Sequence, residues 1–177
     1  MDSIEDLVAN GMVYLGDGNG FQSAIGTKIG TDLPQSIVSV TSADIDGDGK
    51  TDLIVAYRSG PSATHGLQTG VKFYLNPGNG DFSSASSTHV GAPNEETQTV
   101  TVVDVNGDGK LDIVTGNKFS TNKIYLNSVT TLPGTPVFPD TGHSIQIGSD
   151  TDDTKALVVA GEACEICEPP AFRPVVG

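Results

Sequence analysis

The chain has 177 residues, with 9 basic and 22 acidic side chains and a formal net charge of −13 at pH 7. Its length suits one domain with a sizeable core, or part of a larger domain. The acidity argues against binding to nucleic acid or to anionic membranes, and no apolar run approaches the roughly 18 residues of a membrane span. We therefore expect no nucleic-acid partner and no membrane insertion.

The composition favours β-structure. Glycine is abundant, at 22 residues, aromatic side chains are few and tryptophan is absent. This mixture is typical of many short strands joined by tight turns rather than of helices.

Residues 1–35 are expected to form a partial unit, with a strand at 12–15, a glycine-rich turn at 16–20 and a return strand from Phe21. Residues 36–96 then form a complete unit. Its expected elements are a strand at 37–43, an acidic loop at 44–52, a strand at 53–57, a Gly/Ser/Thr-rich loop at 59–70, a strand at 71–75 and a turn at 76–80.

Residues 97–143 repeat this order. The expected elements are a strand at 99–103, an acidic loop at 104–112 and strands at 113–115 and 123–126. Residues 144–161 resemble a degenerate copy, in which Asp150–Lys155 lacks the loop glycines, so strong metal binding is not expected there. Residues 162–177 form a Cys/Pro-rich tail.

The two acidic loops carry the clearest chemical signal. Each has oxygen-bearing side chains at positions 1, 3, 5 and 9 and glycines at positions 4 and 6. Ca²⁺ takes six to eight oxygen ligands, which these side chains and the backbone carbonyl of position 7 can supply. Without a cation, the crowded carboxylates repel one another. The loops are therefore predicted to bind Ca²⁺.

A helix–loop–helix calcium site is the main rival interpretation of these loops. It requires a bidentate Glu at position 12, but that position holds Val55 in the first loop and Thr115 in the second. The flanking residues are apolar and β-branched, which favours strands. Each loop is therefore expected to join two strands.

The repeat has a period of 60 residues, measured from Asp44 to Asp104 and from Tyr14 to Tyr74. A fixed period with four short strands per unit favours the blades of a β-propeller. Two full and two partial units are fewer than a closed ring needs. The ring continues in sequence outside this chain, or another chain completes it, or the units stack openly.

The strand–loop–strand motifs at 44–55 and 104–114 resemble the FG-GAP/VCBS repeat family of calcium-binding β-propeller repeats, as do the hairpins at 14–21 and 74–82. The resemblance covers about residues 10–160 and implies a fold of four-stranded antiparallel blades. It implies these calcium ligands: Asp44, Asp46, Asp48 and Asp52 with the Lys50 carbonyl, and Asp104, Asn106, Asp108 and Asp112 with the Lys110 carbonyl. Members of the family mostly bind proteins or glycans.

No arrangement of catalytic residues was found, so we expect a non-catalytic protein. There is no Gly-x-Ser-x-Gly turn and no His-Glu-x-x-His motif, and the dense carboxylates are assigned to metal. Cys164 and Cys167 are expected to form a disulfide if the protein is secreted, with zinc binding or free thiols as alternatives.

Loops of this kind need millimolar calcium, which indicates an extracellular or cell-surface protein. The acidic start Met1–Asp6 lacks the basic segment of a signal peptide, so we expect the targeting sequence to lie outside this chain. The favoured function is protein adhesion or assembly through the loops at 59–70 and 91–97. A lectin-like module, with Tyr57 or Phe119 as its aromatic platform, and an accessory segment of a polysaccharide-acting enzyme stay open.

Overall fold

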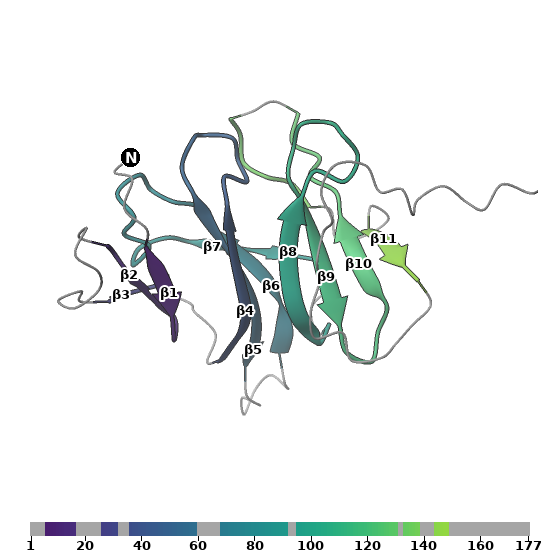
Figure 1. Ribbon diagram of the computed structural model, residues 1–177, viewed down its shortest axis with the longest axis horizontal. Helices are drawn as coiled ribbons and strands as arrows, with labels where there is room; N and C mark the ends of the chain where they lie inside the picture. Colours follow the sequence, from purple (N-terminus) through teal and green to yellow (C-terminus); the bar gives the residue numbers. More distant parts are fainter. Residues whose placement is uncertain are drawn as a thin grey trace, which may run out of the picture.

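The chain folds into three antiparallel β-sheets that stand side by side (Figure 1). A computed structural model describes residues 6–16, 26–31, 36–59, 68–91, 95–130, 133–138 and 144–148. All regular elements within these ranges are strands. Neighbours in sequence are neighbours in each sheet, so each sheet is a simple meander.

The first sheet contains β1 (Leu7–Ala9), β2 (Met12–Tyr14) and β3 (Thr27–Lys28). The second contains β4 (Ser36–Ala43), β5 (Asp52–Ser59), β6 (Gln68–Tyr74) and β7 (Ser87–Val90). The third contains β8 (Thr97–Val103), β9 (Asp112–Asn117), β10 (Asn122–Tyr125) and β11 (Ser144–Ile147). The all-β, four-stranded blade predicted from the sequence is confirmed.

The second and third sheets are copies of one another in detail. In both, the first strand is interrupted by a register shift at the same place, between Ile37 and Ser39 in β4 and between Thr97 and Thr99 in β8. A bulge adds one residue on one strand and bends it locally. The two units therefore share the acidic loop and also the bulge in their first strand.

The second sheet lies between the other two, and its strand β5 is buried on both faces. Along β5, Leu53, Val55 and Tyr57 pack toward the first sheet. Ile54 and Ala56 point the other way, into the core shared with the third sheet. Successive strand residues face opposite sides, so a continuous apolar run is what a doubly covered strand requires.

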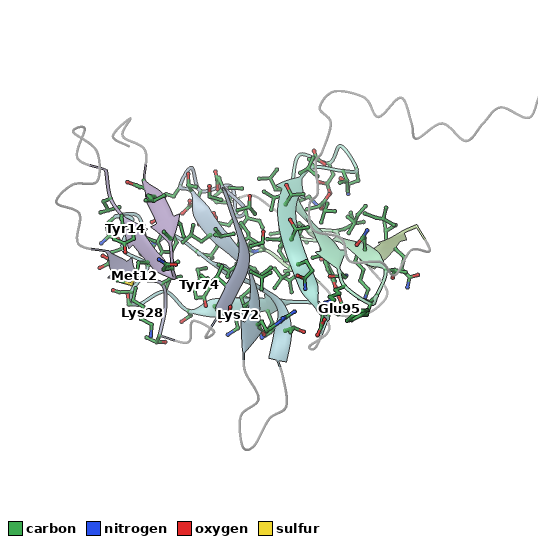
Figure 2. The ribbon with its side chains drawn as sticks, turned by 60° about the horizontal axis from the view of Figure 1, so that its bottom comes forward. Met12, Tyr14, Lys28, Lys72, Tyr74 and Glu95 are labelled. Carbon is green, nitrogen blue, oxygen red and sulfur yellow. The ribbon has the colours of Figure 1, made fainter. Side chains whose placement is uncertain are left out.

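Two apolar cores separate the three sheets. Between the first and second sheets lie Val13, Ile29, Leu53, Val55, Tyr57, Tyr74 and Phe82. Figure 2 shows Tyr74 beside the first sheet, which carries the labelled Met12 and Tyr14. Between the second and third sheets lie Ile45, Ile54, Ala56, Val71, Phe73, Val90, Val100, Ile113, Tyr125 and Phe138. The backbone N–H of Val100 also donates to Ser39 Oγ at 3.3 Å, which ties β8 to β4.

The third sheet takes its last strand from residues beyond the expected boundary at 143. β11 pairs with β10, with Ile145 opposite Ile124. The sequence indicated a new unit here because Asp150–Lys155 resembles an acidic loop and is followed by an apolar run at 157–160. Such local patterns do not identify the strand with which residues 144–147 pair. The rest of the expected degenerate unit, at 149–161, and the tail with Cys164 and Cys167 lie outside the described residues.

Candidate metal sites

The first acidic loop connects β4 to β5 and turns sharply at its two glycines. Gly47 has a φ of 74° and Gly49 a φ of 82°, in the left-handed region that residues with a Cβ adopt only at a cost. These turns bring the side chains of Asp44, Asp46 and Asp48 to one side. The glycines at positions 4 and 6 are therefore needed for the geometry of the loop.

Backbone hydrogen bonds hold the first loop around the Asp44 carboxylate. Its Oδ1 accepts the N–H of Asp48 at 3.0 Å and its Oδ2 accepts the N–H of Gly49 at 2.8 Å. Asp46 Oδ1 accepts the same Asp48 N–H at 3.0 Å. The N–H of Lys50 donates to Asp48 Oδ1 at 2.9 Å. The loop is thus organised by the same oxygens that a cation would use.

The three carboxylates of this loop form a donor set suited to a hard cation. Asp44, Asp46 and Asp48 each contribute one oxygen, and these oxygens lie within 4.8 Å of one another. Burial is the main cause that raises the pKa of Asp46, and its two acidic neighbours raise it further. A divalent cation relieves this repulsion, and oxygen ligands at such spacing suit Ca²⁺.

The second loop, between β8 and β9, repeats the geometry of the first. Gly107 and Gly109 have φ values of 74° and 81°. Asp104 Oδ2 accepts the N–H of Gly109 at 2.8 Å, and Asn106 Oδ1 accepts the N–H of Asp108 at 3.0 Å. Asn106 stands where the first loop has Asp46, so this loop keeps the oxygen donors with one negative charge fewer.

The ninth residues of the loops, Asp52 and Asp112, occupy a different environment from the other predicted ligands. They are 1% and 0% exposed. Asp52 Oδ2 accepts the N–H of Ile45 at 3.0 Å, and its Oδ1 accepts the N–H of Asn76 at 2.8 Å. Burial raises the pKa of Asp52 to about 6 and also raises that of Asp112. Each carboxylate therefore fastens its own loop to the start of the next strand, and its additional role as a metal ligand stays a prediction.

The loop lysines place an ammonium group at the acidic cluster. Lys50 Nζ forms an ion pair with Asp48, and Lys110 Nζ lies 2.9 Å from Asp108 Oδ2. The side-chain hydrogen bond from each lysine is the largest cause that lowers the pKa of Asp48 and of Asp108. The sequence assigned only the backbone carbonyls of these lysines to the site. Each lysine ammonium is therefore a counter-ion within the loop, and a metal ion would have to compete with it for the carboxylate at position 5.

Lys50→Met is expected to raise the calcium affinity of the first loop about two- to fivefold, because a solvent-exposed ion pair is weak and its removal frees Asp48. Calorimetric titration of the chelated protein with Ca²⁺ measures this change. Lys28→Met, on β3, is the control for the loss of one positive charge elsewhere. An unchanged or lower affinity in Lys50→Met contradicts the role of the ammonium as a competitor.

The first loop also contacts the third sheet. Asn127, which follows β10, donates from Nδ2 to the carbonyl of Ile45 at 3.3 Å. The N–H of Gly134 donates to the carbonyl of Asp46 at 2.9 Å. Ile45 is 1% exposed and belongs to the core between the second and third sheets. The candidate metal loop of one unit is therefore part of its interface with the next.

Three residues of these arrangements were not predicted from the sequence. Asn76 and Asn127 occupy matching positions after β6 and β10, and each donates its N–H to the buried Asp of its own unit. Asp6, directly before β1, corresponds to Asp52, the first residue of β5, and its Oδ1 accepts the N–H of Gly16 at 3.0 Å. The available signal was an Asp followed by two aliphatic residues, at Asp6 as at Asp52 and Asp112, and an Asn two residues after Tyr74 and Tyr125.

These observations define an all-β repeat protein whose four-stranded units carry an acidic loop between their first and second strands. A family model described as FG-GAP-like repeat matches residues 2–55 and again residues 62–115, which together exceed half of the chain. The chain therefore belongs to the FG-GAP-like repeat family. No curated protein matches it.

Membership in the family supports the general type of function. FG-GAP repeats generally form non-catalytic binding modules, often bind calcium and are typically extracellular. Among the described residues, no helix is long and apolar enough to cross a membrane. Of the two aromatic side chains considered for a glycan platform, Tyr57 is buried and bonds to His89, whereas Phe119 is 73% exposed.

Proposed function

We propose that this protein is a calcium-stabilised, extracellular, non-catalytic module that binds protein partners. The observation that carries the proposal is the convergence of the Asp44, Asp46 and Asp48 carboxylates within 4.8 Å in a loop that also bonds to the third sheet. The second loop, with Asp104, Asn106 and Asp108, provides the same arrangement of donors. Asp52, Asp112 and the carbonyls of Lys50 and Lys110 are proposed to complete the two sites.

The proposed role of calcium is structural. When bound, the ion neutralises the acidic loop and keeps its turn closed. Because the carbonyls of Ile45 and Asp46 accept hydrogen bonds from Asn127 and Gly134, a closed first loop also holds the third sheet in register with the second. Calcium would thereby fix the relative placement of neighbouring units and of the loops that join their strands.

Protein partners are favoured over other partners by the surface chemistry. The net charge of −13 opposes polyanions, and repeats of this family generally mediate protein interactions. The proposed recognition loops at 59–70 and 91–97 lie mostly outside the described residues. The described strand ends next to them, at Ser59, Gln68, Val90 and Thr97, lie at the ends of the strands away from the acidic loops.

A thermal melt in millimolar Ca²⁺ and in EDTA tests the calcium part of the proposal. Asp46→Ala and Asp108→Ala are each expected to lower the melting temperature in calcium by about 5–10 °C. An occupied site at a hundredfold excess over Kd contributes about 2.7 kcal/mol, and 1 kcal/mol corresponds to about 2–4 °C in a chain of this size. In EDTA both variants should melt close to the wild type. Equal losses in both conditions would show that these side chains act without metal.

One observation favours glycan binding as the second candidate function. Phe119, in the turn between β9 and β10, is 73% exposed and has a left-handed φ of 61°, with Lys118 Nζ 4.7 Å from its ring centroid. A bulky residue in this conformation is strained, and such strain occurs often at functional sites. A glycan array with the wild type and Phe119→Ala separates the two candidates. Glycan binding that the variant loses would favour a lectin-like module over protein adhesion.

A further inference from the structure

Asparagine followed by glycine is the dipeptide in which the backbone most readily attacks its own side chain. The glycine nitrogen can reach the asparagine Cγ, and the missing Cβ leaves that approach unhindered. Within the described ranges this dipeptide begins at Asn10, Asn79 and Asn106, whereas Asn19 lies outside them. Gly11 is buried in the turn between β1 and β2, which shields its nitrogen. Of the three described asparagines, Asn106 alone belongs to a candidate metal loop.

The side chain of Asn106 is folded over the peptide that follows it. Its Oδ1 accepts the N–H of Asp108 at 3.0 Å, which closes a ring around the Gly107 peptide. The same hydrogen bond would stabilise the negative charge that develops on Oδ1 when Cγ is attacked. Asn106 and Gly107 are both exposed, and a Cβ on Gly107 would meet no atom within 4 Å. Water and the reacting groups therefore have free access to this dipeptide.

A carboxylate is placed at the proton that the attacking nitrogen must lose. The Gly107 N–H donates to Asp104 Oδ1 at 2.8 Å. An ionised carboxylate in this position can accept the proton while the bond from nitrogen to Cγ forms, which is general base catalysis. The loop therefore holds the nucleophile, the electrophilic carbon and a proton acceptor in one turn.

The tripeptide at 79–81 is a matched comparison within the same chain. It has the same Asn-Gly-Asp sequence as the tripeptide at 106–108. Asn79 is exposed, and its Oδ1 likewise accepts the N–H of the aspartate two residues on, Asp81, at 3.0 Å. The two asparagines therefore share their local sequence and the fold of their side chains, and a difference in their reactivity has to come from their surroundings.

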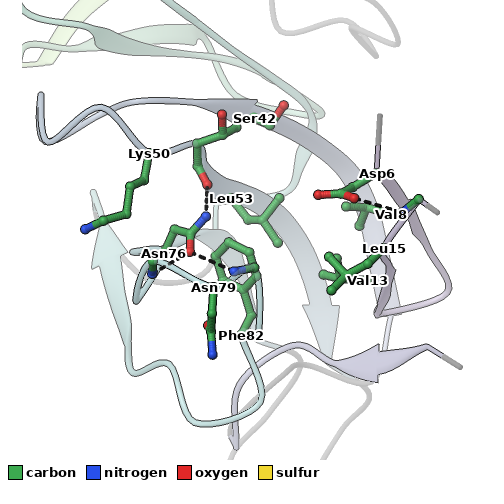
Figure 3. A pocket seen from close by; sticks show the side chains of 14 residues that line it. Asp6, Val8, Val13, Leu15, Ser42, Lys50, Leu53, Asn76, Asn79 and Phe82 are labelled. Carbon is green, nitrogen blue, oxygen red and sulfur yellow. Dashed lines mark hydrogen bonds between the residues drawn. The ribbon is translucent and has the colours of Figure 1, made fainter. Parts of the chain in front are cut away.

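The surroundings of Gly80 differ from those of Gly107 in two ways. The Gly80 N–H donates to Asn76 Oδ1 at 3.3 Å, and this neutral amide oxygen is a far weaker base than a carboxylate. A Cβ on Gly80 would lie 3.0 Å from Leu15 Cδ2, so this glycine is covered on one side. Figure 3 shows Asn79 beside Asn76, with Leu15 across the cavity that these residues line. Gly80 thus lacks both the proton acceptor and the free access of Gly107.

We propose that the second acidic loop modifies itself at Asn106 when no ion occupies the loop. The Gly107 nitrogen forms a bond to the Asn106 Cγ, and the bond from Cγ to the side-chain nitrogen breaks. The proton of the Gly107 N–H passes by way of Asp104 to the departing nitrogen, which leaves as ammonia. The product is a cyclic imide, or succinimide. Water then opens the imide at one of its two carbonyls and gives aspartate or isoaspartate at position 106.

Occupation by calcium is expected to suppress this reaction, an expectation that rests on the proposed function. The ion would engage Asp104 and Asn106, which are both proposed ligands, and would thereby withdraw the proton acceptor and hold Cγ in place. If only the empty loop reacts, the rate falls in proportion to the empty fraction. At a hundredfold excess of Ca²⁺ over Kd, the rate should be about a hundredfold lower.

The two products have different consequences for the second loop. Aspartate at position 106 matches Asp46 of the first loop and adds one negative charge. Isoaspartate lengthens the main chain by one carbon, because the chain then continues through the former side chain, and the donors at positions 1, 3 and 5 no longer converge. Asp46 carries no amide group that could leave as ammonia, so the first loop is spared. A period without calcium is therefore recorded as a permanent change in the second loop.

Incubation of the full chain in EDTA and in millimolar Ca²⁺, followed by proteolysis and mass spectrometry, tests the proposal. Each peptide reports the exchange of amide nitrogen for oxygen at its own asparagine, so Asn79 is an internal control for Asn106. In EDTA we expect Asn106 to react at least about tenfold faster than Asn79, which is part of the hundredfold or more that a well-placed base contributes. In Ca²⁺ the reaction at Asn106 should slow, and the reaction at Asn79 should keep its rate.

The variant Asp104→Asn tests the proton acceptor separately. It replaces the carboxylate by an amide of the same shape, which is the kind of acceptor that Gly80 has. In EDTA we expect Asn106 of this variant to react about as slowly as Asn79, and Asn79 to react as in the wild type. A variant in which Asn106 keeps the wild-type rate would contradict the role of Asp104.

The remaining outcomes separate this proposal from the proposed function. If Asn106 of the wild type reacts no faster than Asn79 in EDTA, the proposal is overturned. If calorimetric titration shows that calcium binds and Ca²⁺ does not slow the reaction at Asn106, protection by calcium is overturned. If the titration shows no binding, the proposed function fails, while a faster reaction at Asn106 in EDTA still supports the modification.

Discussion

Asp112→Ala is expected to lower the free energy of unfolding by about 2–5 kcal/mol, with calcium or without it. Asp112 Oδ2 accepts the N–H of Val105 at 3.0 Å, and its Oδ1 accepts the N–H of Asn127 at 2.8 Å. The side chain is 0% exposed, so its removal leaves two donors without their acceptor, at about 1–3 kcal/mol each. The raised pKa of this carboxyl shows that its burial as an ion is costly, and relief of that cost offsets part of the loss.

Urea unfolding in EDTA and in millimolar Ca²⁺ measures the effect of Asp112→Ala. Asp108→Ala is the matched control, because Asp108 belongs to the same loop but is exposed. We expect Asp108→Ala to matter only in calcium and Asp112→Ala to matter in both conditions. If the two variants behave alike, with losses confined to calcium, Asp112 acts solely as a metal ligand and its role in fastening the loop is contradicted.

Gly91→Ala is expected to destabilise the protein by about 2–5 kcal/mol. Gly91 has a φ of 73°, and a Cβ at this position would lie 2.6 Å from Cε1 of Tyr125 and close to the phenol oxygen. Tyr125 cannot easily move away, because it is 3% exposed and its hydroxyl donates to Glu95 Oε2 at 2.6 Å. Backbone strain contributes about 1–3 kcal/mol, and overpacking of a buried ring a similar amount.

Gly107→Ala is the matched control for the backbone contribution. Gly107 has nearly the same φ, 74°, but a Cβ there meets no atom within 4 Å. Urea unfolding of both variants in EDTA should show a clearly larger loss for Gly91→Ala. Equal losses would mean that strain alone acts and that the contact with Tyr125 is readily relieved.

The sequence predicted the elements that local chemistry determines. The alternation of oxygen donors with glycines at 44–52 and 104–112 requires a particular turn, and both loops adopt it with φ values that agree within a degree. The strands next to the loops followed from their β-branched residues. Membership in the family and the four-stranded blades were predicted on these grounds and are confirmed.

Features that depend on contacts between units could not be predicted in this way. Ile45 and Val105 are both apolar residues at position 2 of an acidic loop, yet Ile45 is 1% exposed and Val105 is 40% exposed. The difference arises because the third sheet covers the first loop. Asp6 was not predicted because its hydrogen bond depends on register with Gly16, which lies ten residues further along the chain and across a hairpin. The assignment of β11 to the third sheet likewise depends on pairing rather than on composition.

The two acidic loops are proposed to be independent calcium sites. Calorimetric titration of the chelated protein with Ca²⁺, repeated for Asp48→Ala, Asp108→Ala and the double variant, tests this proposal most directly. We predict two sites in the wild type, one in each single variant and none in the double variant. Absence of calcium binding to the wild type, or a double variant that binds calcium as the wild type does, would contradict the account.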